Sequence, residues 1–427
     1  MKTIPAYEEL FKGVEIPPFY RLRQDTDGKK LEDVRGEVQK TLKESGVLER
    51  VRPGASVALT AGSREIKNFA LIMKTLCDAL KERGARPFII PAMGSHGGAV
   101  AQNQTALIAH FGITEEAMGV PIKSSMRVVE LGQTAGGIPV YFDEYAAAAD
   151  AIVVVGRIKI HTCFRGRIES GLMKMLAVGC GKQKGAEAMH RRGFSKMSEN
   201  VSEVARVALK KLPVIFGLGI LENARHQTRA VYAIPAEEIE EREAHILDIS
   251  RRVSPRIPFD GLDLLVVERI GKNISGTCMD PNITGRSSPL GSFWPNARAL
   301  AALDLTKESD GSAYGVGNAD VITQRLFDKI IFENTYPNGV TNHDIKPMMI
   351  PPVMPDERYA VLFALTTLAA PGGDYRIAWL QDTLSLDEFY VSEALALNEK
   401  GDFEIDISKK YQINFGADGA KMELVQK

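Results

Sequence analysis

The sequence is poor in the features that mark several whole classes of protein. It has only 4 cysteines among 427 residues (Cys77, Cys163, Cys180 and Cys278), and their wide spacing fits reduced thiols rather than a disulfide framework. Its formal net charge is -1, from 53 basic and 54 acidic side chains, and no long run carries one sign. Neither nucleic-acid binding nor attachment to an anionic membrane is therefore expected.

Long apolar runs, internal repeats and low-complexity tracts are absent as well. No run approaches the roughly 20 apolar residues of a membrane-spanning helix. Residues 1–21 carry Glu8, Glu9 and Glu15 where a signal peptide would have its apolar core. We therefore expect a soluble, cytoplasmic protein.

The chain length predicts two domains, because single hydrophobic cores stop growing at roughly 250–300 residues. A proline-bearing stretch at residues 254–258 is typical of a domain junction. Strand and helix signals alternate on both sides of it, which predicts two α/β domains with largely parallel sheets and an active-site crevice between them. We assign residues 1–256 to an N-terminal cofactor-binding and catalytic domain and residues 257–427 to a C-terminal α/β domain.

The hydrophobic patterns predict the positions of the main elements. In the N-terminal part, we expect strands at 56–60, 87–91, 152–155 and 213–221, helices at 31–42, 66–80 and 197–212, and a charged, exposed helix at 235–252. In the C-terminal part, we expect strands at 262–267, 299–305 and 359–365 and helices at 320–332 and 386–397.

Two histidines follow predicted strands directly. His96 lies in a glycine-rich loop after the strand at 87–91, and His161 follows the strand at 152–155. A single histidine is more often a surface or core residue, but the carboxyl ends of parallel strands meet at one edge, so this pair can line one crevice. Histidine suits proton transfer near neutral pH because its unperturbed pKa is about 6.5. A pair on opposite faces of a substrate could act on both enantiomers.

Two cations have similar positions. Lys272 follows the strand at 262–267, and Arg64 follows the strand at 56–60. A guanidinium group pairs with a carboxylate in bidentate fashion, so Arg64 is a candidate anion clamp. The alternative is a purely structural role, in which Arg64 forms a salt bridge at the start of a helix.

Three familiar motifs are incomplete. Gly179-Cys180-Gly181-Lys182 lacks the first glycine and the Ser/Thr of a phosphate-binding loop, and we interpret it as a turn. Gly217-Leu218-Gly219 lacks the third glycine of a dinucleotide-binding fingerprint. The histidine and cysteines of residues 161–180 lack the spacing of a zinc site, which leaves zinc as a minor alternative.

The stretch from His161 to His190 resembles the lactate racemase family, whose members use a nickel-pincer nucleotide. In that family a histidine after a strand is followed by Ser-Gly-Gly-x-Lys, and another histidine lies sixteen positions after the lysine. Here Ser170-Gly171-Leu172-Met173-Lys174 follows His161, and His190 lies sixteen positions after Lys174. The similarity extends from about Ser56 to about Pro281.

The resemblance implies how the cofactor would be held. Lys174 would carry its pyridinium ring covalently through a thioamide, and Ser170 and Gly171 would lie beside it. His190 would bind nickel.

The resemblance also implies the residues that meet the substrate. His96 and His161 would be the acid/base pair, and Arg64 and Lys272 would contact the substrate. Arg269 stands where the family has a glutamine, and the family's acidic residue three positions before Arg64 is absent. Both differences favour a substrate larger or more polar than lactate.

These residues together predict an isomerase that inverts a hydroxyl-bearing carbon of a 2-hydroxy acid or sugar acid. The C–H bond of such a carbon is poorly acidic, which favours hydride transfer to and from the cofactor over simple deprotonation. Two alternatives remain. One is a lyase or aldolase in which Lys174 forms a Schiff base with a carbonyl substrate. The other is a non-catalytic protein that binds small acids.

Overall fold

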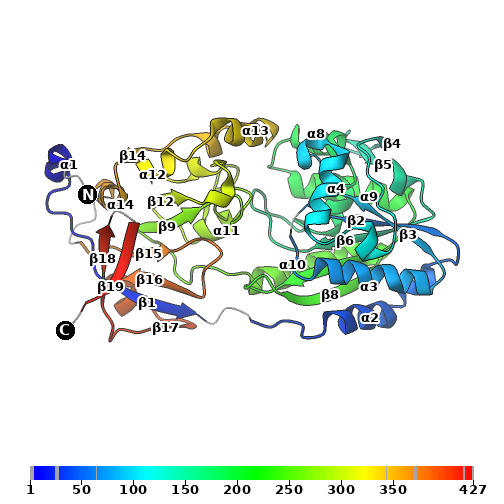
Figure 1. Ribbon diagram of the computed structural model, residues 1–427, viewed down its shortest axis with the longest axis horizontal. Coiled ribbons are helices and arrows are strands. Elements are labelled where there is room, and N and C mark those ends of the chain that lie inside the picture. The colour runs from blue at the N-terminus through cyan, green and yellow to red at the C-terminus, as the bar shows by residue number, and fades with distance from the viewer. Residues whose placement is uncertain are drawn as a thin grey trace. The chain divides into compact units, whose positions relative to one another are not determined.

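The computed structural model describes residues 4–24, 28–63, 65–342, 344–368, 373–416 and 419–425. They form two compact units, one spanning Asp27–Ser254 and the other joining Met1–Thr26 to Pro255–Lys427 (Figure 1). Each unit combines helices with its own main sheet and its own hydrophobic cores. The predicted fold class, two α/β domains, is confirmed.

The sheet of the Asp27–Ser254 unit has the strand order β3-β2-β6-β7-β8. Its strands β2 (Ser56–Ala61), β3 (Arg86–Pro91), β6 (Ala151–Arg157) and β7 (Val214–Glu222) are parallel, whereas β8 (Thr228–Pro235) is antiparallel to β7. β3 and β6 lie on either side of β2 and run parallel to it, so their carboxyl ends lie at the same edge of the sheet. They are about 10 Å apart there, since neighbouring strands are separated by about 4.8 Å.

Helices cover both faces of this sheet. The central strand β6 shows the division, because Ile152 and Val154 face one core while Val153 and Val155 face the other. The helices are α2 (Val34–Glu44), α3 (Phe69–Glu82), α4 (Ala101–His110) and α5 (Glu115–Met118) on the side of Val153, and α9 (Met197–Lys211) and α10 (Ile239–Val253) on the side of Ile152. A hairpin of β4 (Val128–Gln133) and β5 (Pro139–Asp143), followed by α6 (Glu144–Ala147), completes the unit.

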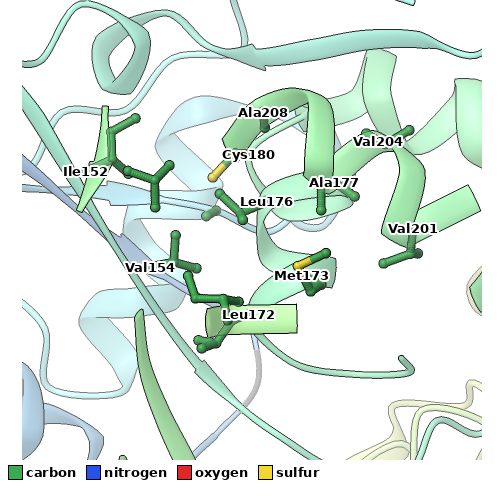
Figure 2. Packing of buried hydrophobic residues seen from close by; sticks show 14 of the residues in the cluster. Ile152, Val154, Leu172, Met173, Leu176, Ala177, Cys180, Val201, Val204 and Ala208 are labelled. Atoms are coloured by element: carbon green, nitrogen blue, oxygen red, sulfur yellow. The ribbon is translucent and has the colours of Figure 1, made fainter. Parts of the chain in front are cut away.

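Residues 172–190, which we call the hook, follow β6 on the Ile152 side of the sheet. The hook consists of α7 (Leu172–Lys174), a π-helical turn η3 (Met175–Gly179) and α8 (Lys182–His190). Figure 2 shows how Leu172, Leu176 and Cys180 pack beside Ile152 and Val154 of β6, while α9 lies on the other side of the cluster. Burial of these three side chains against β6 therefore fixes the first half of the hook.

Gly217 of β7 is part of this packing. A Cβ atom at Gly217 would lie 2.6 Å from Cδ1 of Leu172, so only glycine leaves room for the start of the hook. The Gly217-Leu218-Gly219 motif lies inside β7 rather than at its end, in agreement with the rejection of a dinucleotide site.

The main sheet of the other unit has the order β14-β13-β12-β9-β15-β16-β1-β18-β19, with β17 also paired to β1. It is parallel from β14 to β15 and antiparallel from there on. The strands are β1 (Phe19–Gln24), β9 (Leu264–Ile270), β12 (Ala299–Leu305), β13 (Val321–Thr323), β14 (Val353–Met354), β15 (Ile377–Leu380), β16 (Glu388–Ser392), β17 (Phe403–Ile405), β18 (Tyr411–Gly416) and β19 (Gly419–Leu424). The helices are α1 (Pro5–Leu10), α11 (Pro281–Thr284), α12 (Gln324–Phe327), α13 (Phe332–Asn342), α14 (Glu357–Thr367) and α15 (Glu393–Asn398).

The position of the first strand, β1, differs from the expected division of the chain into domains. β1 pairs with β16, β17 and β18, so residues up to Thr26 belong with the C-terminal part rather than with the expected domain of residues 1–256. The sequence hides this arrangement because the partner strands lie more than 350 positions away. The second junction, between Ser254 and Pro255, falls in the proline-bearing stretch that marked it.

One predicted element of the C-terminal part is wrong, and two are wrong in part. Residues 359–365 belong to helix α14, which Asp356 caps by accepting the N–H of Tyr359 at 3.0 Å. This helix is apolar on most of its surface because it is buried, and such a run cannot be distinguished from a buried strand by periodicity. The ranges 320–332 and 386–397, expected to be helical throughout, each begin with a strand, β13 and β16, that pairs with neighbouring strands of the sheet. The helices α12 and α15 follow these strands.

Within the described ranges, no helix is both long enough and apolar enough to cross a membrane. The cytoplasmic location stays a prediction.

We expect Leu172→Ala to destabilise the Asp27–Ser254 unit by about 2–5 kcal/mol, because Leu172 is fully buried and the smaller side chain leaves a cavity. Urea unfolding measures the change. Val129→Ala is the control in the same unit, since Val129 is 38% exposed and its loss should change the free energy by no more than about 0.5 kcal/mol. Equal effects of the two substitutions would contradict the buried position of the hook.

Candidate active site

His161 lies on a loop that closes on itself directly after β6. Two backbone hydrogen bonds between Lys159 and Ser170, of 2.8 and 3.2 Å, close this loop. Inside it, the fully buried Glu169 carboxylate accepts the backbone N–H of His161 at 2.7 Å. Arg251 of α10 donates to the same carboxylate at 2.7 Å. A buried carboxylate, paired with the exposed Arg251, therefore fixes the backbone of His161.

The imidazole of His161 has a defined tautomer. Its Nδ1 lies 3.0 Å from the backbone N–H of Cys163, and its ring stacks on Phe164 with 4.1 Å between the ring centroids. A backbone N–H can only donate, so Nδ1 accepts and the proton of the neutral ring is on Nε2. His161 thus presents an N–H donor.

Positive charge gathers around this ring. Burial is the largest cause that lowers the pKa of His161 well below its ordinary value, and the charges of Lys174, Lys159, Arg165 and His190 lower it further. Lys174 Nζ also lies 6.0 Å from the centroid of the Phe164 ring on which His161 stacks. The structure therefore brings Lys174 and His190 into the electrostatic neighbourhood of His161, and the resulting field favours an anionic ligand.

His96 lies at the carboxyl end of β3 and has the opposite tautomer. Its Nδ1 is 2.7 Å from the carbonyl oxygen of Met93. A carbonyl oxygen can only accept, so Nδ1 carries the proton and Nε2 is the nitrogen that can accept one. The buried Gln104 of α4 fixes this loop by donating to the carbonyls of Gly94 and His96, each at 3.0 Å.

A buried acid holds the start of the hook. Glu243 of α10 accepts the backbone N–H of Met173 through Oε2 at 2.9 Å, next to Lys174. Its Oε1 has no hydrogen-bond partner among the described residues, and a Cβ atom at Gly171 would lie 2.4 Å from it. Burial raises the pKa of Glu243 to about 7. Gly171 is therefore required for the close approach of Glu243, and Ser170 lies in the loop closure just before it.

None of the three predicted cations is among the described residues of this unit. Arg64 falls outside the described residues. Lys272 and Arg269 belong to the other unit, where Lys272 Nζ donates to the carbonyl of Gly276 at 2.7 Å and Arg269 lies 3.6 Å from Asp382. Their contact with substrate stays a prediction.

The minor zinc alternative gains no support. The part of the chain that the structure describes contains no group of three or more His, Cys, Asp or Glu side chains placed to hold a metal ion. Cys180 is fully buried in the core below the hook, and this burial raises the pKa of its thiol. A thiolate ligand at this position is therefore disfavoured.

Glu169, Glu243 and Arg251 have no part in the site that the sequence predicts. The burial of Glu243 could have been predicted, because Glu243 lies at helical spacing from the apolar residues Ile239 and Ile246, which are buried on the same face of α10. The prediction that residues 235–252 form an exposed helix is therefore wrong for this face of α10. No local pattern marks Glu169, because its partner Arg251 lies 82 positions away.

The fold places this chain among the α/β proteins whose candidate site lies at the carboxyl edge of a parallel sheet. Residues 21–202 match the family model of the lactate racemase N-terminal domain. Residues 21–202 are thus similar to the N-terminal domain of lactate racemases.

Two solved structures are similar to it. The lactate racemase apoprotein from Thermoanaerobacterium thermosaccharolyticum aligns over 90% of this chain and 96% of its own, with a TM-score of 0.56 and 14% identity. A structural-genomics protein from Thermotoga maritima aligns over 63% of this chain and 70% of its own, with a TM-score of 0.48 and 14% identity. No curated protein matches the sequence.

We expect Glu243→Gln to remove a pH dependence of stability. Because burial raises the pKa of Glu243 from 4.5 to about 7, its stabilising contribution is full below about pH 4.5 and is lost as the pH rises to about 7. The unfolding free energy of the variant minus that of the wild type should therefore rise by up to about 3 kcal/mol between pH 5 and 8. Gln keeps an oxygen that accepts the N–H of Met173.

Urea unfolding at several pH values measures this difference. Glu241→Gln, which removes an exposed carboxylate from the same helix, is the control against which the Glu243→Gln difference is compared. A flat difference for Glu243→Gln would show that Glu243 titrates like an exposed acid.

Proposed function

We propose that the protein is a racemase or epimerase that inverts the hydroxyl-bearing carbon of a 2-hydroxy acid or sugar acid with the help of a nickel-pincer nucleotide. The observation that supports this most strongly is the position of Lys174, whose Nζ lies 6.0 Å from the centroid of the Phe164 ring on which His161 stacks. The family match over residues 21–202 supports the same reaction class.

The residues present fit such a cofactor. Lys174 has the primary amine that a covalent thioamide requires, and Phe164 offers a flat apolar surface beside it. The imidazole of His190 is a ligand type that suits nickel. The positive charge around His161 suits the anionic phosphate and thiocarboxylate groups of the nucleotide. When bound, the cofactor would take a hydride from the substrate carbon and return it.

The two histidines have different tasks in this proposal. His96 accepts the proton of the substrate hydroxyl at Nε2, as the carbon loses its hydrogen, and gives the proton back when the hydrogen returns to the opposite face. His161 stays neutral because burial and the surrounding cations lower its pKa. Its Nε2–H donates a hydrogen bond to a substrate oxygen and orients it.

Arg64, Lys272 and Arg269 remain the proposed contacts for the substrate. Guanidinium and ammonium groups pair with the carboxylate of a hydroxy acid or sugar acid, and arginine does so in bidentate fashion. The small-molecule substrate is the only partner that the proposal requires.

We expect Lys174→Ala to abolish covalent attachment of the cofactor and His190→Ala to keep the attachment but lose most of the nickel. The proteins should be made in a host that supplies the cofactor and then analysed by intact-mass spectrometry and metal analysis. Lys184→Ala removes an exposed lysine of α8 and should change neither quantity. Full activity without nickel, or borohydride trapping of a carbonyl substrate on Lys174, would instead favour the Schiff-base lyase.

We expect His96→Gln to lower kcat by about 10²- to 10⁴-fold, the usual contribution of general acid–base catalysis. His161→Gln should cost about tenfold or less, because the amide keeps an N–H donor. Chiral chromatography from both enantiomers measures the rates, and circular dichroism checks that both variants fold. Equal large losses would show that His161 is itself a proton acceptor.

A further inference from the structure

We propose that Lys182 is a positioning residue that fixes both His190 and the His96 loop relative to Lys174. This inference rests on the proposed function for its catalytic meaning, but not for its structural content. Lys182 ends the Gly179-Cys180-Gly181-Lys182 sequence, which fails as a phosphate-binding loop and has no role in the site as described so far.

Lys182 is the corner of the hook. Its φ of 53° is left-handed, and α8 doubles back there instead of continuing the axis of the π-helical turn. A Cβ atom at Gly185 would lie 3.5 Å from the carbonyl oxygen of Ala177, eight positions earlier. These positions would be about 12 Å apart along a straight helix.

The reversal at Lys182 is what allows His190 to act near Lys174. A straight helix would separate positions 174 and 190 by about 24 Å, at 1.5 Å per residue. In the folded hook, the approach of Gly185 to Ala177 instead turns α8 back, so His190 lies closer to Lys174 than a straight helix would allow. The corner therefore converts a long spacing in sequence into a shared site.

The side chain of Lys182 also holds the loop of His96. It is fully buried, forms an ion pair with the buried Asp143 at 3.0 Å and donates to the carbonyl oxygen of Pro91, the last residue of β3. Five positions after Pro91 comes His96. The ammonium group of Lys182 thus links the corner of the hook to the start of the His96 loop.

Backbone contacts next to Lys182 strengthen this link. The N–H of Gly94 donates to the carbonyl of Gly179 at 3.1 Å. A Cβ atom at Gly179 would lie 2.7 Å from the carbonyl oxygen of Ala92, so the two backbones touch with no room for a side chain. A shift of the corner would be transmitted to His96 on one side and to His190 on the other.

The test replaces the buried pair without leaving a lone charge. Lys182→Met alone would strand the Asp143 carboxylate in the core, which is strongly destabilising, so the variant is Lys182→Met with Asp143→Asn. The amide oxygen introduced by Asp143→Asn can still accept the N–H of Ala146, as the Asp143 carboxylate does when it caps α6. Lys184→Met, two positions further on the exposed side of α8, is the matched control.

Hydrogen exchange of the full-length apoprotein, followed by mass spectrometry, is the first readout. We expect peptides covering residues 92–98 and 182–194 to exchange at least tenfold faster in the double variant, with the rest of the Asp27–Ser254 unit unchanged. A purely stabilising role would accelerate exchange throughout the unit, and a uniform or absent change would overturn the proposal. If the double variant does not fold, Asp143→Asn alone should give a smaller change in the same two peptides, and no change there would overturn it.

Nickel content of protein from the cofactor-supplying host is the second readout. We expect the double variant to keep the covalent adduct on Lys174 and to lose nickel about 10- to 100-fold more readily during dialysis, because residues that orient a metal ligand have effects of this size. Unchanged nickel retention together with the faster exchange would limit Lys182 to the His96 loop and contradict its role for His190. If wild-type protein carries no adduct, the proposed function fails, while hydrogen exchange still decides the role of Lys182.

Discussion

The candidate site depends on the burial of the hook against β6. Leu172 and Leu176 enter the core beside Ile152 and Val154, and Gly217 leaves the space that Leu172 requires. Hydrophobic burial of this kind is not directional, so it cannot by itself place a lysine and a histidine. The direction comes from polar groups at three fixed points, which are the start of the hook, its corner and the loop just before it.

Helix α10 supplies two of these polar groups from one face. Glu243 holds the backbone at Met173, and Arg251, about two helical turns later, holds Glu169 and through it His161. Both carboxylates are buried, and burying a charge is costly unless it is paired or neutralised. Glu169 is paired with Arg251, whereas Glu243 avoids its cost through the raised pKa. The start of the hook and the His161 loop therefore share one scaffold.

Much of this arrangement could be predicted from sequence, because it depends on local patterns. The parallel strands β2, β3 and β6 have continuous apolar runs, and the positions of His96 and His161 after two of them follow directly. Lys174 and His190 could be found because their spacing is itself the motif. The predicted strands and helices of the Asp27–Ser254 unit are accordingly present.

What could not be predicted depends on distant partners. β1 is a strand because residues more than 350 positions away pair with it, and the run at 359–365 is equally compatible with a strand or a buried helix. Lys182 looked like part of a turn, because a sequence does not show that its ammonium group reaches Asp143 and Pro91. The two histidines looked equivalent for a different reason, because a sequence does not show which backbone group each ring contacts: Cys163 for His161 and Met93 for His96.

The central claim is inversion of a hydroxyl-bearing carbon with retention of its own hydrogen. The most direct test follows a panel of 2-deuterated hydroxy acids and sugar acids, incubated in ordinary water with protein from a cofactor-supplying host, by chiral chromatography and mass spectrometry. The account predicts that at least one acid approaches an equilibrium mixture of its two epimers or enantiomers while the deuterium stays on its carbon. Inversion accompanied by complete loss of deuterium to the solvent would contradict it, because the carbon would then have been deprotonated.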